Sequence, residues 1–261
     1  MDASDADLAR RFGGLERLYG PEAYARLRAA RCTVIGVGGV GSWAAEALAR
    51  SGVSRLTLID LDNVAESNVN RQVHAITPTL GQAKVIALQE RIALIHPGCQ
   101  VDAIEEFIDE DNVATLLQAA DTDVVLDCCD QVRAKAAALA WAAQMDRAAV
   151  TVGAAGGKTS PHEVELADLS EVTHDPLLAS LRQRLRQRHN AARKGRMGVR
   201  CVFSREPVLG SQAATCEQPQ RSGSLNCAGY GSSVMVTATF GMVAAAEALK
   251  LVLQSKASLG R

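Results

Sequence analysis

The sequence has few aromatic residues, no paired-cysteine motif and no excess of either charge. Only 3% of its 261 residues are Phe, Trp or Tyr, which argues against a nucleic-acid groove built on many stacking rings. Lys and Arg number 28 and Asp and Glu 29, which excludes a wholly basic nucleic-acid coat but not a local basic patch. The seven cysteines contain no C-x-x-C spacing, so we expect no structural zinc site.

A leader pattern and a long uninterrupted apolar run are also missing. The first 11 residues are polar and lack a basic segment followed by an apolar one, so we expect a cytoplasmic protein with reduced thiols. Residues 234–253 are the most apolar stretch, but Glu247 and Lys250 interrupt it. We therefore expect a buried core helix and no membrane insertion.

Strand-like and helix-like segments alternate through the first 153 residues, which predicts an α/β fold with a doubly wound, mostly parallel sheet. We expect one domain over 1–261, in which 1–153 and 154–261 form two halves. The expected strands are 31–36, 55–60, 101–107, 123–127 and 149–153, and the expected helices are 40–51, 82–95, 111–119 and 132–145.

A glycine-rich loop follows the first expected strand. Gly36, Gly38, Gly39 and Gly41 match G-x-G-x-x-G between a strand and a helix, the Rossmann-like context in which such a loop holds phosphates at a helix N-terminus. Asp60 ends the next strand, where a carboxylate holds ribose hydroxyls. Together these features predict a nucleotide site.

The nucleotide itself is indicated by charged residues further along the chain. Arg71 and Lys84 follow the Asp60 strand, and two fixed cations suit a triphosphate better than a dinucleotide. Asp127 and Asp130 flank the end of a later strand, where a carboxylate holds Mg²⁺ on phosphates. An NAD(P)-dependent oxidoreductase remains an alternative that leaves both cations unexplained.

These motifs resemble the adenylating domain of the ubiquitin-activating superfamily, which includes the molybdopterin- and thiamine-biosynthesis adenylyltransferases. The resemblance implies a single adenylating domain, with 1–153 as its nucleotide-binding half and 154–261 as its substrate-binding and dimerisation half. It also implies catalysis by Arg71, Lys84 and Asp130, with ATP and Mg²⁺ as cofactors. The shared chemistry is attack of a carboxylate on the α-phosphate of ATP. The implied ATP contacts are Gly36, Gly38, Gly39, Gly41, Asp60, Asp62, Asn68, Arg71, Lys84, Asp127 and Asp130, with Mg²⁺ at Asp130.

Further segments resemble one family in that superfamily, the tRNA threonylcarbamoyladenosine dehydratases. They are 11–14, 17–20, 39–50, 201–204 and 236–241. This resemblance implies ATP-dependent cyclisation of the modified adenosine in tRNA, a homodimer, a sulfur-relay partner and a monovalent cation near the site. Arg11 and Arg17 are candidates for completing the partner subunit's ATP site, and the helix at 234–253 is a candidate for the dimer interface.

A basic stretch supports an RNA partner. Residues 176–205 contain nine basic and no acidic side chains, and a polyanion would relieve their mutual repulsion. A solvated basic face is the alternative explanation. The candidate RNA-binding residues are Arg182, Arg186, Arg193, Lys194 and Arg196.

Three alternatives concern the chemistry. Cys227, and less favourably Cys201, could act as an acyl acceptor, although cyclisation within the substrate needs none and an inert buried thiol is the commoner case. The chain could instead adenylate the C-terminus of a ubiquitin-like sulfur carrier, which the missing C-x-x-C pairs argue against. It could also be a non-catalytic sulfur-relay partner. The five isolated histidines indicate no histidine catalysis.

Overall fold

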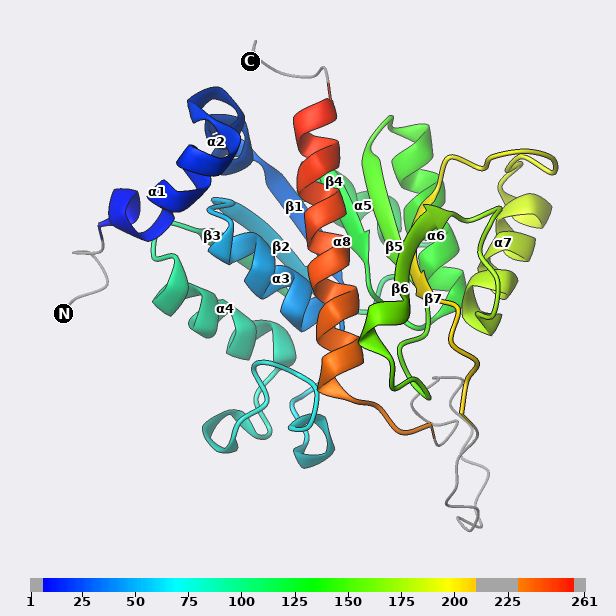
Figure 1. Cartoon of the computed structure of the whole chain (residues 1–261), viewed down its shortest axis with the longest axis horizontal. Coiled ribbons are helices and arrows are strands. Elements are labelled where there is room, and N and C mark those ends of the chain that lie inside the picture. Colours follow the sequence, from blue (N-terminus) through cyan, green and yellow to red (C-terminus); the bar gives the residue numbers. More distant parts are fainter. Residues whose placement is uncertain (1–6, 210–229, 256–261) are drawn as a thin grey trace.

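A seven-stranded sheet with helices on both faces forms the body of the computed structural model, which describes residues 7–209 and 230–255 (Figure 1). The strands are β1 Arg31–Ile35, β2 Arg55–Ile59, β3 Gln100–Ile104, β4 Val124–Asp127, β5 Ala148–Val152, β6 Val164–Asp168 and β7 Arg200–Ser204. The helices are α1 Leu8–Tyr19, α2 Pro21–Ala29, α3 Gly41–Arg50, α4 Lys84–Ile95, α5 Val113–Ala119, α6 Val132–Gln144, α7 Pro176–Arg188 and α8 Val234–Gln254.

The strand order is β3-β2-β1-β4-β5-β7-β6, and among the described strands only β6 runs antiparallel to its neighbour. This confirms the predicted doubly wound, mostly parallel sheet. Strand β1 pairs with both β2 and β4, with Ile35 level with Ile59 on one side and Asp127 on the other. The chain therefore changes winding direction beside β1, and the carboxyl ends of β1 and β4 form the switch point where such sheets bind ligands.

Two helical layers cover the sheet (Figure 1). Helices α2, α3, α4 and α8 pack over side chains such as Val34 and Leu58, whereas α5 and α6 pack over Ile35, Ile59 and Val125. Helix α7 extends the second layer by packing against α6. The alternation follows from the period of two along each strand, which buries both faces of a parallel sheet.

Helix α8 is the central helix of its layer. By length and apolar composition it could cross a membrane, but 56% of its most apolar window is buried inside the protein. It packs closely on α3 because Gly241 has no side chain, and a Cβ there would lie 2.6 Å from the carbonyl oxygen of Val40. The prediction of a buried core helix is confirmed.

The structure contains elements that the sequence analysis did not predict. Helices α1 and α2 precede the first strand, where we predicted no element. The third strand ends at Ile104 rather than 107, and strands β6 and β7 were not predicted. Strand β6 is only half-buried for most of its length, so its apolar signal is weak. Strands β6 and β7 and helix α8 complete the same sheet and core as the first 153 residues.

Candidate nucleotide site

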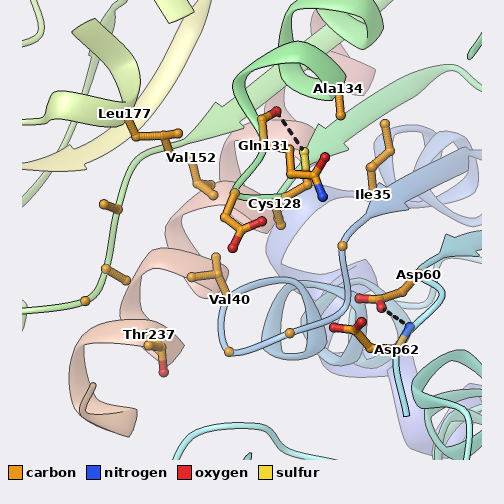
Figure 2. Close-up of a pocket in the computed structure, with 18 of the residues that line it drawn as sticks. Ile35, Val40, Asp60, Asp62, Cys128, Gln131, Ala134, Val152, Leu177 and Thr237 are labelled. Atoms are coloured by element: carbon orange, nitrogen blue, oxygen red, sulfur yellow. Dashed lines mark hydrogen bonds between the residues drawn. The ribbon is translucent and has the colours of Figure 1, made fainter. Parts of the chain in front are cut away.

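A cavity of about 300 Å³ opens at the predicted edge of the sheet, where β1, β2, β4 and β5 end. Figure 2 shows Asp60 and Asp62 on one side of it and Val152 and Leu177 on the other. A second cavity of about 440 Å³, lined mainly by the segment between β2 and α4, adjoins the first. Arg71 lines both cavities, as do Gln72 and Lys84.

Two glycines of the glycine loop, Gly36 and Gly41, lie so close to neighbouring backbone that a side chain would not fit. Gly36 has a φ of +79°, and a Cβ there would lie 2.9 Å from the backbone nitrogen of Cys129. A Cβ on Gly41 would lie 1.8 Å from the carbonyl oxygen of Gly36. Gly41 therefore closes the loop against the start of α3, while Gly36, Gly38 and Gly39 line the cavity.

The end of β2 brings a carboxylate pair beside this loop. Asp60 accepts hydrogen bonds from the backbone of Val37 at 2.8 Å and of Asp62 at 2.9 Å. Burial raises the pKa of Asp60, and the Lys84 ammonium opposes that rise. Lys84 opens α4 and donates to Asp62 at 2.6 Å. The predicted ribose and phosphate residues therefore lie together.

Arg71 is fixed where the two cavities meet. Its Nη1 donates to the Ser67 carbonyl at 2.7 Å and to Asn70 Oδ1 at 2.9 Å. The Trp43 indole donates to the Arg71 carbonyl at 2.9 Å. Burial lowers the pKa of Arg71. Asn68 lines the second cavity, and its Oδ1 accepts from the backbone of Ala65 at 3.0 Å.

The two aspartates at and just after the end of β4 have different surroundings. Asp130 lines the first cavity, with Cys128 and Cys129 beside it. Asp127 lies outside the cavity lining and is fully buried, with Lys135 Nζ at 3.0 Å and Thr151 Oγ1 at 2.6 Å. With these contacts, Asp127 holds neighbouring protein groups in place and does not face the cavity.

The far wall of the cavity was not predicted. Asp175 caps α7 by accepting from Leu178 N at 2.9 Å, and its other oxygen accepts from Ala154 N at 2.8 Å. A Cβ on Gly153 would lie 2.0 Å from that oxygen. The Asp-Pro start of a helix and the glycine after β5 were visible in the sequence, but their contact is long-range.

The basic stretch divides into an internal part and an exposed part. Arg182 donates to the carbonyls of Leu169 and Val172, and Arg186 donates to that of Ala192. Arg193, Lys194 and Arg196 are exposed in the loop between α7 and β7. That loop follows the end of α7 remote from the cavity (Figure 1), and 13 helical residues span about 20 Å.

The remaining predicted residues lie away from the cavity or outside the residues that the structure describes. Arg11 donates to the carbonyls of Leu94 and Ile95, which end α4, and Arg17 is exposed on α1. Cys201 is buried in β7 and, as for the other four described cysteines, burial raises its pKa. Cys227 lies outside the described residues.

The strand order, glycine loop and carboxylate–cation set at the switch point define a Rossmann-like nucleotide-binding protein. The model of the ThiF family matches residues 10–260, and the chain belongs to this family. It is 43% identical to the tRNA threonylcarbamoyladenosine dehydratase of Escherichia coli and covers 96% of both chains. It is 42% identical to the dehydratase of Haemophilus influenzae over 95% of both chains.

Solved structures agree with this assignment. The E. coli tRNA N6-threonylcarbamoyladenosine dehydratase in complex with ATP matches with a TM-score of 0.84 at 42% identity. The match covers 95% of this chain and 96% of that chain. The resemblance predicted from the motifs is confirmed, and the oxidoreductase hypothesis is left without support.

Proposed function

We propose that the chain cyclises threonylcarbamoyladenosine in tRNA, using ATP to adenylate the threonylcarbamoyl carboxylate. The observation that carries the proposal is the pair of adjoining cavities with Arg71 and Lys84 at their junction. One cavity presents the glycine loop and Asp60 to a nucleotide, and the other leaves room for the group that reacts with it. The full-length likeness to named dehydratases supports the same substrate.

The reaction needs charge stabilisation rather than a protein nucleophile. The substrate carboxylate attacks the α-phosphorus, the bond to the bridging oxygen breaks, and pyrophosphate leaves. A group within the threonylcarbamoyl moiety then attacks the activated carbonyl carbon and releases AMP, which carries away one carboxylate oxygen. Arg71 and Lys84 stabilise the charge that develops on the phosphates. The raised pKa values of the described cysteines suit a route without a thiolate.

Mg²⁺ fits this site as a partner of the nucleotide. The described residues contain no group of three or more His, Cys, Asp or Glu side chains that could hold a metal ion by themselves. Mg²⁺ is usually held by one or two carboxylates together with substrate phosphates, and Asp130 supplies such a carboxylate at the cavity wall. Bound there, Mg²⁺ would neutralise phosphate charge.

The proposal also concerns the RNA contacts, the assembly and the partners of the protein. The exposed Arg193, Lys194 and Arg196 offer contacts to the RNA backbone, whereas Arg182 and Arg186 hold the fold together. A homodimer, a cytoplasmic location, a monovalent cation and a sulfur-relay partner remain predictions. The internal bonds of Arg11 do not favour a role in a partner's site.

The test of adenylation is the identity of the nucleotide product. Incubation with α-labelled ATP, Mg²⁺ and tRNA carrying threonylcarbamoyladenosine should give AMP, and unmodified tRNA should give none. Formation of ADP would contradict adenylation. AMP formation with a ubiquitin-like carrier protein, and none with the modified tRNA, would favour the sulfur-carrier alternative.

A further inference from the structure

A buried ion pair lies beneath the turn that carries Asp130. Lys135, on α6, and Asp127, at the end of β4, are both fully buried. Lys135 Nζ lies 3.0 Å from Asp127 Oδ2 and donates to the carbonyl oxygens of Cys129 at 2.9 Å and Asp127 at 3.4 Å. One ammonium group thus joins a helix, a strand end and a turn.

Both side chains of the pair have hydrogen-bond partners, and the Lys135 ammonium is stabilised. Thr151 Oγ1 donates to Asp127 Oδ2 at 2.6 Å, and Cys129 Sγ donates to Oδ1 at 3.0 Å. Burial by itself lowers the pKa of Lys135, but the Asp127 carboxylate outweighs it and the pKa is raised. Buried ion pairs add little net stability compared with apolar packing, and their best-attested use is to fix a geometry.

The geometry fixed here is that of the turn Cys128–Asp130, which lines the first cavity. Cys128 N donates to the Ile35 carbonyl at 2.8 Å, which joins the turn to β1. Gly36 abuts the next residue so closely that a Cβ would lie 2.9 Å from Cys129 N. The Lys135 bond to the Cys129 carbonyl therefore sets how far the turn stands above the glycine loop. Asp130 is the next residue and lines the cavity.

We propose that Lys135 and Asp127 are positioning residues that hold the Cys128–Asp130 turn against the glycine loop and so place the Asp130 carboxylate for magnesium-bound ATP. The inference rests on the proposed function of the site, because it concerns how the same site is built. Residues that support a metal ligand from behind commonly control metal affinity without touching the ion. Asp127 thus positions Asp130 and does not itself contact Mg²⁺.

The double variant Lys135→Met/Asp127→Asn tests this role. It removes both charges together, so no unpaired buried charge is left, and the introduced amide keeps partners for Thr151 and Cys129. We expect the Mg²⁺ concentration that half-saturates ATP binding, measured by calorimetry, to rise about tenfold. Affinity for AMP, which does not depend on the metal, should stay at the wild-type value.

A control removes an ion pair that lies on other elements and has one buried partner. Glu247, buried on α8, pairs at 3.3 Å with the partly exposed Arg200 where β7 begins. The variant Arg200→Met/Glu247→Gln should leave the Mg²⁺ dependence of ATP binding unchanged even if it lowers Tm. The isosteric Thr151→Val variant removes one hydrogen bond to Asp127 and should shift the Mg²⁺ dependence in the same direction by less.

The outcomes separate the two proposals. An unchanged Mg²⁺ dependence in both Thr151→Val and a folded Lys135→Met/Asp127→Asn would overturn the positioning role and leave the proposed function standing. Wild-type ATP binding that is indifferent to Mg²⁺ would overturn the magnesium assignment and this inference with it. Faster hydrogen exchange at the amides of Cys129 and Asp130 in the double variant, with Tm preserved, would support the role.

Discussion

At the residue scale, Arg71 shows how local contacts make a side chain available for chemistry. Its backbone carbonyl accepts a hydrogen bond from Trp43 on α3, and its guanidinium donates to Ser67 and Asn70 in the preceding segment. Gly39 leaves the space it needs, since a Cβ there would lie 3.3 Å from Arg71 Cγ. A cation held before the reaction begins needs little reorganisation to stabilise the developing charge.

Replacing Arg71 by Ala should therefore lower the rate of AMP formation about 100-fold or more. Tm should change little, because the Trp43 bond is made to the Arg71 backbone. The matched control is Arg55→Ala, an exposed arginine at the amino end of β2, away from the cavity. Equal activity of the Arg71 and Arg55 variants would contradict the assignment.

His74 gives a residue-scale prediction about stability. The ring is buried without a protein hydrogen-bond partner, and burial, with Lys84 and Arg91, lowers its pKa to about 4. In the unfolded chain the ring titrates near its usual value of about 6.5. Between these pH values the unfolded state binds the extra proton, so stability falls as pH falls through this window.

Urea unfolding at pH 7 and pH 5 should reveal about 2 kcal/mol of stability loss due to this ring. A His74→Phe variant should lack that part of the loss, whereas His162→Gln, at a mostly exposed histidine, should keep it. Identical pH dependence in wild type and His74→Phe would show that the ring is not held neutral.

At the scale of elements, the glycine loop combines two kinds of glycine. Gly36 has a positive φ and touches the Cys129 backbone, whereas a Cβ on Gly38 would meet only Gln72 Nε2 at 3.9 Å. The first glycine is therefore required by the fold. We expect the second to be required because it lets a phosphate approach the backbone.

Alanine at these two positions should separate the requirements. Gly36→Ala should cost about 2 kcal/mol or more of stability, because a left-handed conformation and a backbone clash are both imposed. Gly38→Ala should keep its Tm and lose ATP affinity. Thermal melts and ATP titrations measure both, and loss of stability in Gly38→Ala would argue against the distinction.

The exposed basic loop between α7 and β7 makes an ionic-strength prediction. Changing Arg193, Lys194 and Arg196 to Gln should weaken tRNA binding and reduce the slope of log K against log salt by about 2. Arg182→Gln should instead lower Tm, because that guanidinium serves two carbonyl groups. An unchanged salt slope in the triple variant would remove this loop from the RNA interface.

At the scale of the whole molecule, local patterns predicted most of the fold. Apolar strands, the 3.6-residue period of helices such as α4 and the glycine loop are set by neighbours in sequence. Helices α1 and α2 and strand β6 were missed because few of their side chains are buried and their places depend on long-range packing. Strand β7 was missed as well. The parallel direction of most strands followed from the alternation of strands and helices along the chain.

The site was predictable where a motif placed residues at one strand edge. The glycine loop, Asp60, Arg71, Lys84 and Asp130 all line the cavities. The surroundings of Asp127 were not predictable, because its partner Lys135 lies on the following helix and only the fold turns that side chain inward. The internal bonds of Arg182 escaped prediction for the same reason.

The most direct test of the central claim is the mass of the modified nucleoside after reaction. Purified protein is incubated with ATP, Mg²⁺ and tRNA that carries threonylcarbamoyladenosine, and the RNA is digested and analysed by mass spectrometry. We expect the nucleoside to lose the mass of one water only when ATP is present, and Arg71→Ala to abolish most of the loss. A nucleoside that keeps its mass with active, ATP-binding protein would contradict it.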